Sequence, residues 1–222
     1  MISAAALFLA VRSGDPGSGP AAGAGTGAGT TLTSPTVDSA TPPASSTPVR
    51  ARIVTVAESQ IGYQTVPSDT YCNKYSYYWR SGTGTICGNG LKSEEWCADF
   101  AAWVWRTAGA SFAWSFRSGD IYSGAISFYQ WAVAHGTWHA VGDGYQPQPG
   151  DVAVYGLTLT AGTADHVAVV TGYTPGDQGP DVVNGDGDRG AFSIVQAEPD
   201  QFRADAPGQR APLAGYASPI IK

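Results

Sequence analysis

The stretch EWCADFAAWVW, residues 95–105, decides the fold, because it places one cysteine at the head of an apolar pattern with helical period. Gly109 follows this pattern, where a left-handed residue commonly ends a helix. The pattern predicts a helix over about residues 96–108, with Cys97 in its first turn. A helix start supplies unpaired backbone N–H groups and partial positive charge, which favour the thiolate form of a cysteine.

Two more helices and a set of strands follow from periodicity. Apolar residues at helical spacing predict a helix that begins near Val49 and stops at Gly62, and another at 126–134. The period then changes to short apolar runs between turn residues. These runs predict strands at 151–155, 166–173, 181–184, 191–196 and 212–216. Helices followed by strands predict an α+β domain, with N-terminal helices packed on an antiparallel sheet.

The first 48 residues differ in composition from the rest of the chain. Residues 1–11 are a short apolar run, like a truncated signal or anchor segment, and are too short to span a bilayer. Residues 12–48 consist mainly of Gly, Ala, Ser, Thr and Pro, which predicts a disordered linker. We therefore expect one folded domain at 49–222, with no stable membrane insertion.

Charge and aromatic content narrow the class of partner. The net charge is -6 and no basic run is present, which excludes a protein that tracks the nucleic-acid backbone. Seven tryptophans and eleven tyrosines among 29 glycines are typical of a loop-rich domain whose aromatic side chains line a groove for a polar ligand.

The three cysteines are expected to divide into one bridge and one thiol. Cys72 and Cys87 flank a polar, glycine-rich stretch, whereas Cys97 opens the apolar helix, so the surface bridge is predicted between the first two. A loop of that size gains about 3 kcal/mol in the chain-entropy model. A bridge implies an oxidising compartment, and the apolar N-terminal run agrees with export. The alternative is three free thiols inside the cell.

The chain offers three histidines as a base for Cys97. His135 and His139 follow a helix end and are expected at the surface or as caps. Gly136 separates them, and no acid or cysteine nearby completes a metal site, so no metal is expected. His166 instead begins an apolar strand, where a rigid element can present its imidazole. The alternative reading is that Cys97 and His166 are structural core residues.

A catalytic imidazole needs an acceptor on its other ring nitrogen to fix the tautomer. Asp165 is adjacent to His166 but faces the opposite side of the strand. Asn184 and Asp186 lie two residues apart on a neighbouring strand, so both can approach the ring if the strand continues through Gly185. The same stretch is also compatible with a polar turn, and it lacks the acid that completes a calcium loop.

The stretch at 95–105, Pro149-Gly150-Asp151-Val152 and Asp165-His166-Val167-Ala168-Val169-Val170 together resemble the CHAP family, the cysteine, histidine-dependent amidohydrolases/peptidases. The resemblance extends over about residues 51–220 and implies a papain-like (NlpC-like) fold, with Cys97 as nucleophile and His166 as base. The family's third position, commonly in a Glu-Gly-Asn motif, here reads Asn184-Gly185-Asp186. Asp186 is the favoured orienting residue, and Asn184 is the alternative.

The resemblance implies a secreted, cell-wall-associated enzyme without a cofactor, acting on peptidoglycan or its peptide stems through a Cys97 thioester. Trp96, Asp165 and Tyr75 are expected to contact the substrate, and the protein is expected to be monomeric. Residue spacing does not distinguish an amidase from an endopeptidase. Two other readings remain: a transamidase or transpeptidase with the same acyl-enzyme, and a non-catalytic wall-binding module that uses the aromatic segment at 71–79.

Overall fold

The computed structural model describes residues 48–68, 70–84, 86–88, 90–177, 179–187, 190–194 and 211–222. The chain divides into two compact units, and all of the described residues belong to the second, 43–222. The segments expected at 1–11 and, apart from Pro48, at 12–48 lie outside the described residues.

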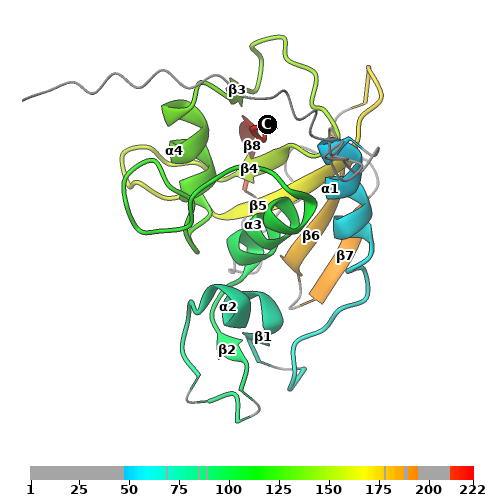
Figure 1. The fold of residues 1–222 in the computed structure, drawn as a ribbon. Helices are drawn as coiled ribbons and strands as arrows, with labels where there is room; N and C mark the ends of the chain where they lie inside the picture. Colours follow the sequence, from blue (N-terminus) through cyan, green and yellow to red (C-terminus); the bar gives the residue numbers. More distant parts are fainter. Residues whose placement is uncertain are drawn as a thin grey trace, which may run out of the picture. The chain divides into compact units, whose positions relative to one another are not determined.

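Helices occupy the first part of this unit and most strands the second part (Figure 1). The helices are α1 Val49–Glu58, α2 Lys74–Trp79, α3 Cys97–Ala108 and α4 Ile126–Ala134. The strands are β1 Cys72–Asn73, β2 Lys92–Ser93, β3 Trp138–Ala140, β4 Val152–Tyr155, β5 His166–Gly172, β6 Asp181–Gly187, β7 Gly190–Ile194 and β8 Leu213–Ala217. The expected α+β class is confirmed.

The main sheet has six strands in the order β3-β8-β4-β5-β6-β7, and every neighbouring pair is antiparallel. The central strand β4 is buried along its whole length, and so are the first five residues of β5. Strands buried on both faces need apolar residues at consecutive positions, which explains the sequences VAVY and HVAVV. The centre of this sheet is therefore rigid where His166 enters it.

Helix α3 packs against β5 and β6 and against α1 and α2 (Figure 1). Nine of its twelve residues are buried, which suits a helix with neighbours on several sides. Two side-chain hydrogen bonds hold the C-terminal half of α3 in place. Arg52 Nε donates to the carbonyl of Ala108 at 2.9 Å, and Trp105 Nε1 donates to the carbonyl of Gly150 at 2.9 Å. Gly109 ends the helix in the left-handed conformation, as predicted.

Most of the longer helices and strands lie where the sequence periodicity predicts them, whereas the shortest elements were not predicted. The helix at 126–134 and the strands at 151–155, 166–173 and 212–216 are confirmed within one or two residues. Strand β3 was expected to be loop. It is an edge strand of three residues, paired only with β8, and too short for alternation to be visible. His139 on this strand stacks on the ring of Tyr145, with ring centroids 3.6 Å apart.

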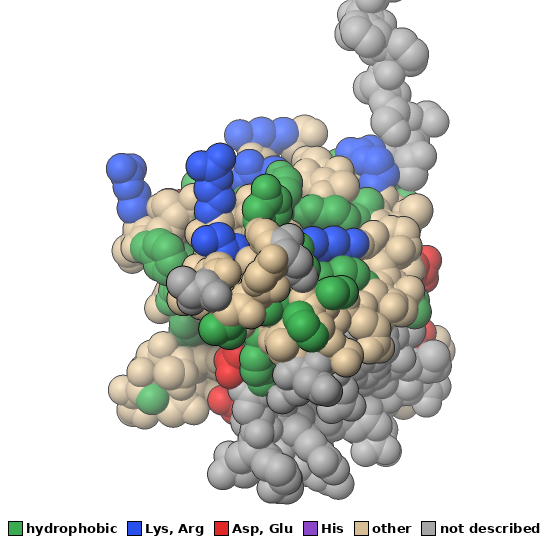
Figure 2. Space-filling view, turned by 90° about the horizontal axis from the view of Figure 1, so that it is seen from below, with side chains coloured by type: hydrophobic (Ala, Val, Ile, Leu, Met, Phe, Trp, Pro, Cys, Tyr) green, Lys and Arg blue, Asp and Glu red, His purple; other side chains and the backbone are tan. Residues whose placement is uncertain are grey.

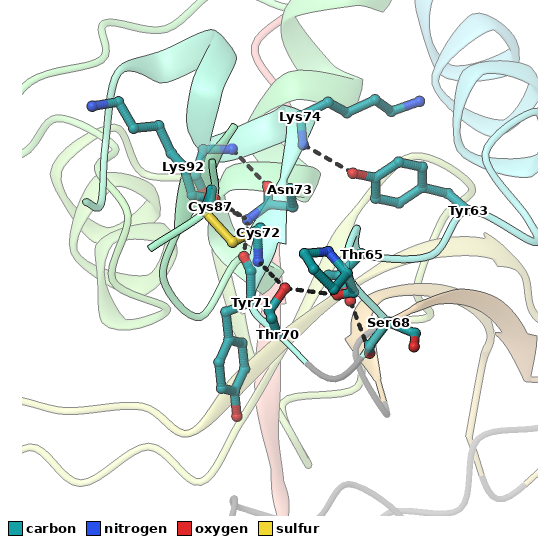
Figure 3. The surroundings of a disulfide bond; sticks show 12 residues. Tyr63, Thr65, Ser68, Thr70, Tyr71, Cys72, Asn73, Lys74, Cys87 and Lys92 are labelled. Carbon is teal, nitrogen blue, oxygen red and sulfur yellow. Dashed lines mark hydrogen bonds between the residues drawn. A yellow bond between two sulfur atoms is a disulfide. The ribbon is translucent and has the colours of Figure 1, made fainter. Parts of the chain in front are cut away.

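The segment between Cys72 and Ser93 forms a small substructure beside α3 (Figure 1), and Figure 3 shows the residues around its disulfide. The predicted Cys72–Cys87 disulfide is confirmed, and β1 pairs with β2 through Cys72 and Ser93. Asn73 caps α2: its Oδ1 accepts hydrogen bonds from the N–H groups of Tyr75 at 2.9 Å and Ser76 at 2.8 Å. A two-stranded ladder alone is marginal in water, so the bridge and the cap stabilise it.

No helix within the described ranges is long and apolar enough to cross a membrane.

Candidate active site

Cys97 is the first residue of α3 and the one free cysteine of the described chain. Its side chain is 7% exposed, at the point where α3 meets the start of β5. The backbone N–H of Val167 donates a hydrogen bond to its sulfur. Since Val167 directly follows His166, this contact places the thiol beside the first residues of β5. The structure thus places Cys97 close to the start of β5, where His166 lies.

Burial raises the pKa of the Cys97 thiol above its ordinary value, and the nearby Asp186 carboxylate raises it further. The hydrogen bond from Val167 acts in the opposite direction but does not outweigh them. The sequence led us to expect a thiolate favoured by the helix start. In this structure desolvation dominates instead. Burying the thiolate costs more free energy than the helix N-terminus supplies by stabilising its charge. Burial and the nearby carboxylate thus both favour the neutral form of the thiol.

His166 is 8% exposed and opens β5. Its Nε2 lies 2.8 Å from Oδ1 of Asn184, a fully buried residue on β6. The amide oxygen can only accept, so this bond assigns the proton to Nε2. Nδ1 is then the ring nitrogen that can accept a proton from a thiol. The pairing of β5 with β6, in which Ala168 lies opposite Asn184, sets the approach of the two side chains.

Asp186, the favoured orienting residue, contacts the start of α3. Its Oδ2 accepts a hydrogen bond from the backbone N–H of Trp96 at 2.7 Å. Asp186 has a φ of 66°, and the β6–β7 register shifts between Gly185 and Gly187. This irregularity breaks the alternation on which a shared face for Asn184 and Asp186 depended. Asn184, the alternative candidate, is hydrogen-bonded to the His166 ring at 2.8 Å.

The three residues expected to contact substrate lie in different environments. Trp96 and Tyr75 are fully buried and stack on each other, with ring centroids 5.1 Å apart and planes 19° apart. In this conformation neither side chain is accessible to a substrate, and both pack in the core at the start of α3. Asp165 is exposed, and its backbone N–H donates to the carbonyl of Tyr155 at 2.9 Å. Of the three, Asp165 alone is accessible.

The close approach of α3 to β6 depends on Gly185. A Cβ added to this residue would lie 2.4 Å from Cβ of Phe100, a distance that packed atoms do not reach. Gly185 stands between Asn184 and Asp186, so the missing side chain lets both residues approach α3. The sequence showed this glycine only as part of a polar triplet. Its packing role required the position of Phe100.

Asp99, two residues after Cys97, is fully buried and was not singled out from the sequence. Its Oδ2 accepts hydrogen bonds from Oγ of Ser76 at 2.5 Å and of Ser81 at 2.9 Å. Burial raises its pKa to about 8, and a hydrogen bond with the Glu94 carboxyl contributes. Both effects favour the protonated form of Asp99. In the sequence, the indication was an acidic residue in the largely apolar first half of the helix.

His135 and His139 lie apart from this site, as a helix cap and on the edge strand. His135 follows α4, and its Nδ1 lies 2.8 Å from the carbonyl of Trp131. Across the described ranges, no group of three or more His, Cys, Asp or Glu side chains is placed to hold a metal ion. The reactive groups that the described residues bring to this site are a thiol, an imidazole and an amide.

Comparison with known proteins gives one family match. Residues 86–184 match the model of the CHAP domain, a range that contains Cys97, His166 and, as its last residue, Asn184. Among solved structures, the peptidoglycan hydrolase RipB from Mycobacterium tuberculosis is similar with a TM-score of 0.37 and 12% identity. That alignment covers 75% of this chain and 63% of RipB. No curated protein matches the chain. The family match over residues 86–184 includes all three sequence motifs and confirms the resemblance that they carry.

Proposed function

We propose that the domain at 49–222 is an exported cysteine hydrolase that cleaves amide bonds in bacterial peptidoglycan through a thioester on Cys97. The observation that carries this proposal is the convergence of Cys97, next to the Val167 N–H, with the His166–Asn184 hydrogen bond of 2.8 Å. The CHAP match supports the reaction class. The wall substrate is the class that the family resemblance implies, and the disulfide agrees with export.

The first step forms the acyl-enzyme. Nδ1 of His166 takes the proton of the Cys97 thiol as the sulfur attacks the amide carbonyl, giving a tetrahedral intermediate and an imidazolium. The intermediate collapses to a thioester as His166 returns the proton to the leaving amine. Water then attacks the thioester with His166 as base, releasing the carboxylic acid and restoring the thiol. Atoms and charges balance with no cofactor.

The raised pKa of Cys97 gives His166 its role. Because burial favours the neutral thiol, the imidazole is the base that takes the proton as the sulfur attacks. Throughout the reaction, Oδ1 of Asn184 accepts a hydrogen bond from the Nε2–H of His166. This bond holds the tautomer and stabilises the imidazolium without adding a second negative charge to the site. A carboxylate at that position would raise the thiol's pKa further, as Asp186 already does.

Backbone donors for the developing oxyanion come from the first turn of α3. The N–H of Trp96 is engaged by Asp186 at 2.7 Å. The N–H of Cys97 lies one residue further, within a turn whose N–H groups have no partner inside the helix. Such donors commonly contribute several kcal/mol to acyl transfer. Asp186 thereby positions the donor turn and takes no part in proton transfer.

The test is mass spectrometry of fragments released from purified peptidoglycans of several crosslink types. The wild-type chain is expected to release fragments that identify the bond, and Cys97→Ala to release none while remaining folded. Cys72→Ser provides a control for loss of a cysteine as such. Full activity in Cys97→Ala would refute the proposal. Products that join an added amine to the acyl group would identify a transamidase instead.

A further inference from the structure

The disulfide segment has a charge opposite to that of the whole chain. Residues 70–93 contain Lys74, Arg80 and Lys92 and no Asp or Glu, whereas the chain has 12 basic and 18 acidic residues. Asp69 precedes the segment and Glu94 and Glu95 follow it, so its positive charge is confined to the residues between them. Three cations within one short segment can hold an anionic ligand on an otherwise acidic protein.

No carboxylate neutralises these three side chains within the part of the chain that the structure describes. The ion pair found there joins Arg50 to Asp151, outside the segment. Lys74 Nζ donates to Oε1 of Gln60 at 2.6 Å and lies 4.5 Å from the ring centroid of Tyr63. Arg80 and Lys92 extend from the end of α2 and from β2, which contact each other.

Exposed aromatic side chains accompany these cations. Tyr77 is 57% exposed and Tyr78 is 51% exposed, although both belong to a helix whose Tyr75 and Ser76 are buried against α3. Figure 2 looks onto the end of the domain where α2, β1 and β2 lie, and shows Lys and Arg side chains gathered among hydrophobic ones. We call Tyr77, Tyr78, Arg80 and Lys92 the basic platform.

The platform is held in place from beneath. The Cys72–Cys87 bridge closes the loop, and Ser76 and Ser81 are anchored on Asp99 of α3. Trp79 Nε1 donates to the carbonyl of Asp99 at 2.9 Å. A surface that is already ordered loses little conformational entropy when a ligand binds. Tyrosines on such a surface provide flat faces and hydroxyl groups at low entropic cost.

We propose that the basic platform binds a phosphate-bearing glycopolymer of the bacterial wall, distinct from the peptide that Cys97 cleaves. The proposal rests on the proposed function for its location at the wall. A polymer with one anion per repeat pairs with separate cations at once, and its sugar or polyol units lie against the tyrosine rings. Tyr77 and Tyr78 are exposed to solvent while Tyr75 packs toward Trp96, so the platform does not face the thiol.

The experiment uses the full chain carrying Cys97→Ala, which binds without cleaving, and immobilised poly(glycerol phosphate) as the probe. Binding that weakens as salt rises is expected. Arg80→Gln with Lys92→Gln should weaken binding at least about fivefold, since two exposed ion pairs are lost. Tyr77→Ala with Tyr78→Ala should weaken it by a similar factor without changing the salt dependence.

The matched control is Leu159→Glu with Lys222→Gln, which changes the net charge equally at exposed positions outside the segment. It should bind as the parent does. Equal weakening by control and platform variants would overturn the proposal, as would binding to phosphate-stripped peptidoglycan that matches binding to the polymer. Fragment release by the Cys97 enzyme from stripped peptidoglycan tests the hydrolase separately. Platform variants should leave that release unchanged.

Discussion

The two sides of α3 are built on different principles. Toward the sheet, the contact is apolar and close, with Phe100 against the bare backbone of Gly185. Toward α2, aromatic packing of Tyr75 on Phe100 and Trp103 is combined with a buried polar contact, in which the carboxyl of Asp99 accepts from Ser76 and Ser81. Cys97 is the first residue of this helix. The two sides therefore differ in the buried carboxyl and its hydrogen bonds, which the α2 side adds to apolar packing.

This difference teaches which part of the domain supports which function. The proposed catalytic residues His166 and Asn184 lie on strands of the main sheet, where side chains are closely packed. The basic platform lies on the α2 side, which contains the disulfide and the buried carboxyl of Asp99. Substitutions on the two sides should therefore differ in size, in pH dependence and in their effect on hydrolysis.

The largest effect is expected from Gly185→Ala. The added Cβ would lie 2.4 Å from Phe100, so β6 or α3 must move. We expect a loss of about 3 kcal/mol in the free energy of unfolding, and loss of hydrolysis because Asn184 moves with its neighbour. Denaturant unfolding and fragment release measure the two effects. Gly84→Ala, whose Cβ would meet Lys92 Nζ at 3.4 Å, is the control, and equal losses in both variants would contradict the account.

Removal of the disulfide should come next in size. Cys72→Ser with Cys87→Ser opens a loop with a sequence separation of 15, which corresponds to about 3 kcal/mol in the chain-entropy model and less where the free segment retains structure. Polymer binding by the platform should fall, while hydrolysis by folded protein persists. Thermal unfolding and fragment release test this. Loss of hydrolysis with the fold intact would show that the two sides are not separable.

The buried carboxyl of Asp99 predicts a pH dependence on the α2 side. Burial raises the pKa of Asp99 from 3.8 to about 8, so folding favours its protonated form. This contribution is complete below the unfolded pKa and declines as pH rises toward the folded one, so stability should fall between about pH 4 and pH 8. Asp99→Asn, which imitates the protonated acid, should reduce that fall by at least about 1 kcal/mol.

Chemical unfolding of Asp99→Asn at a series of pH values makes this measurement. Asp143→Asn, which changes an exposed carboxylate, is the control and should leave the pH dependence as it is in the wild type. If the stability of Asp99→Asn falls with pH as steeply as that of the wild type, the carboxyl of Asp99 does not hold a proton in the folded state.

The smallest effect on stability is expected from Asp186→Asn, because an amide oxygen can still accept from the Trp96 N–H. Removing the carboxylate takes away one cause of the raised pKa of Cys97. The pH profile of Cys97 alkylation should shift to lower pH, with a rate about threefold higher near neutrality. An unchanged or slower rate would show that Asp186 acts on the thiol by geometry alone.

The sequence predicted the long elements because each carries its own periodic pattern. Helix α3 and strands β4 and β5 followed from apolar spacing, and Cys97 and His166 from their places at element ends. The disulfide followed from the contrast between the polar loop and the apolar helix. These features depend on local composition, which one sequence contains in full.

Other features depend on contacts between distant residues. The different contacts of Asn184 and Asp186 depend on the register shift between Gly185 and Gly187, which no local sequence pattern predicts. The raised pKa of Cys97 required its burial, since the helix start alone indicates the opposite direction. Asp99 and Ser76 are 23 residues apart, so their hydrogen bond could not be read from spacing. Helix α2 and strand β3 were too short to show a period.

The central claim is that Cys97 forms the acyl-enzyme with His166 as base. The most direct test is mass spectrometry of the intact protein, quenched in acid during turnover of peptidoglycan fragments, followed by peptide mapping. The account predicts an acyl adduct confined to the Cys97 peptide, accumulating when water attack is slow and absent in His166→Ala. Continued hydrolysis with no adduct on Cys97, or an adduct on another residue, would contradict it.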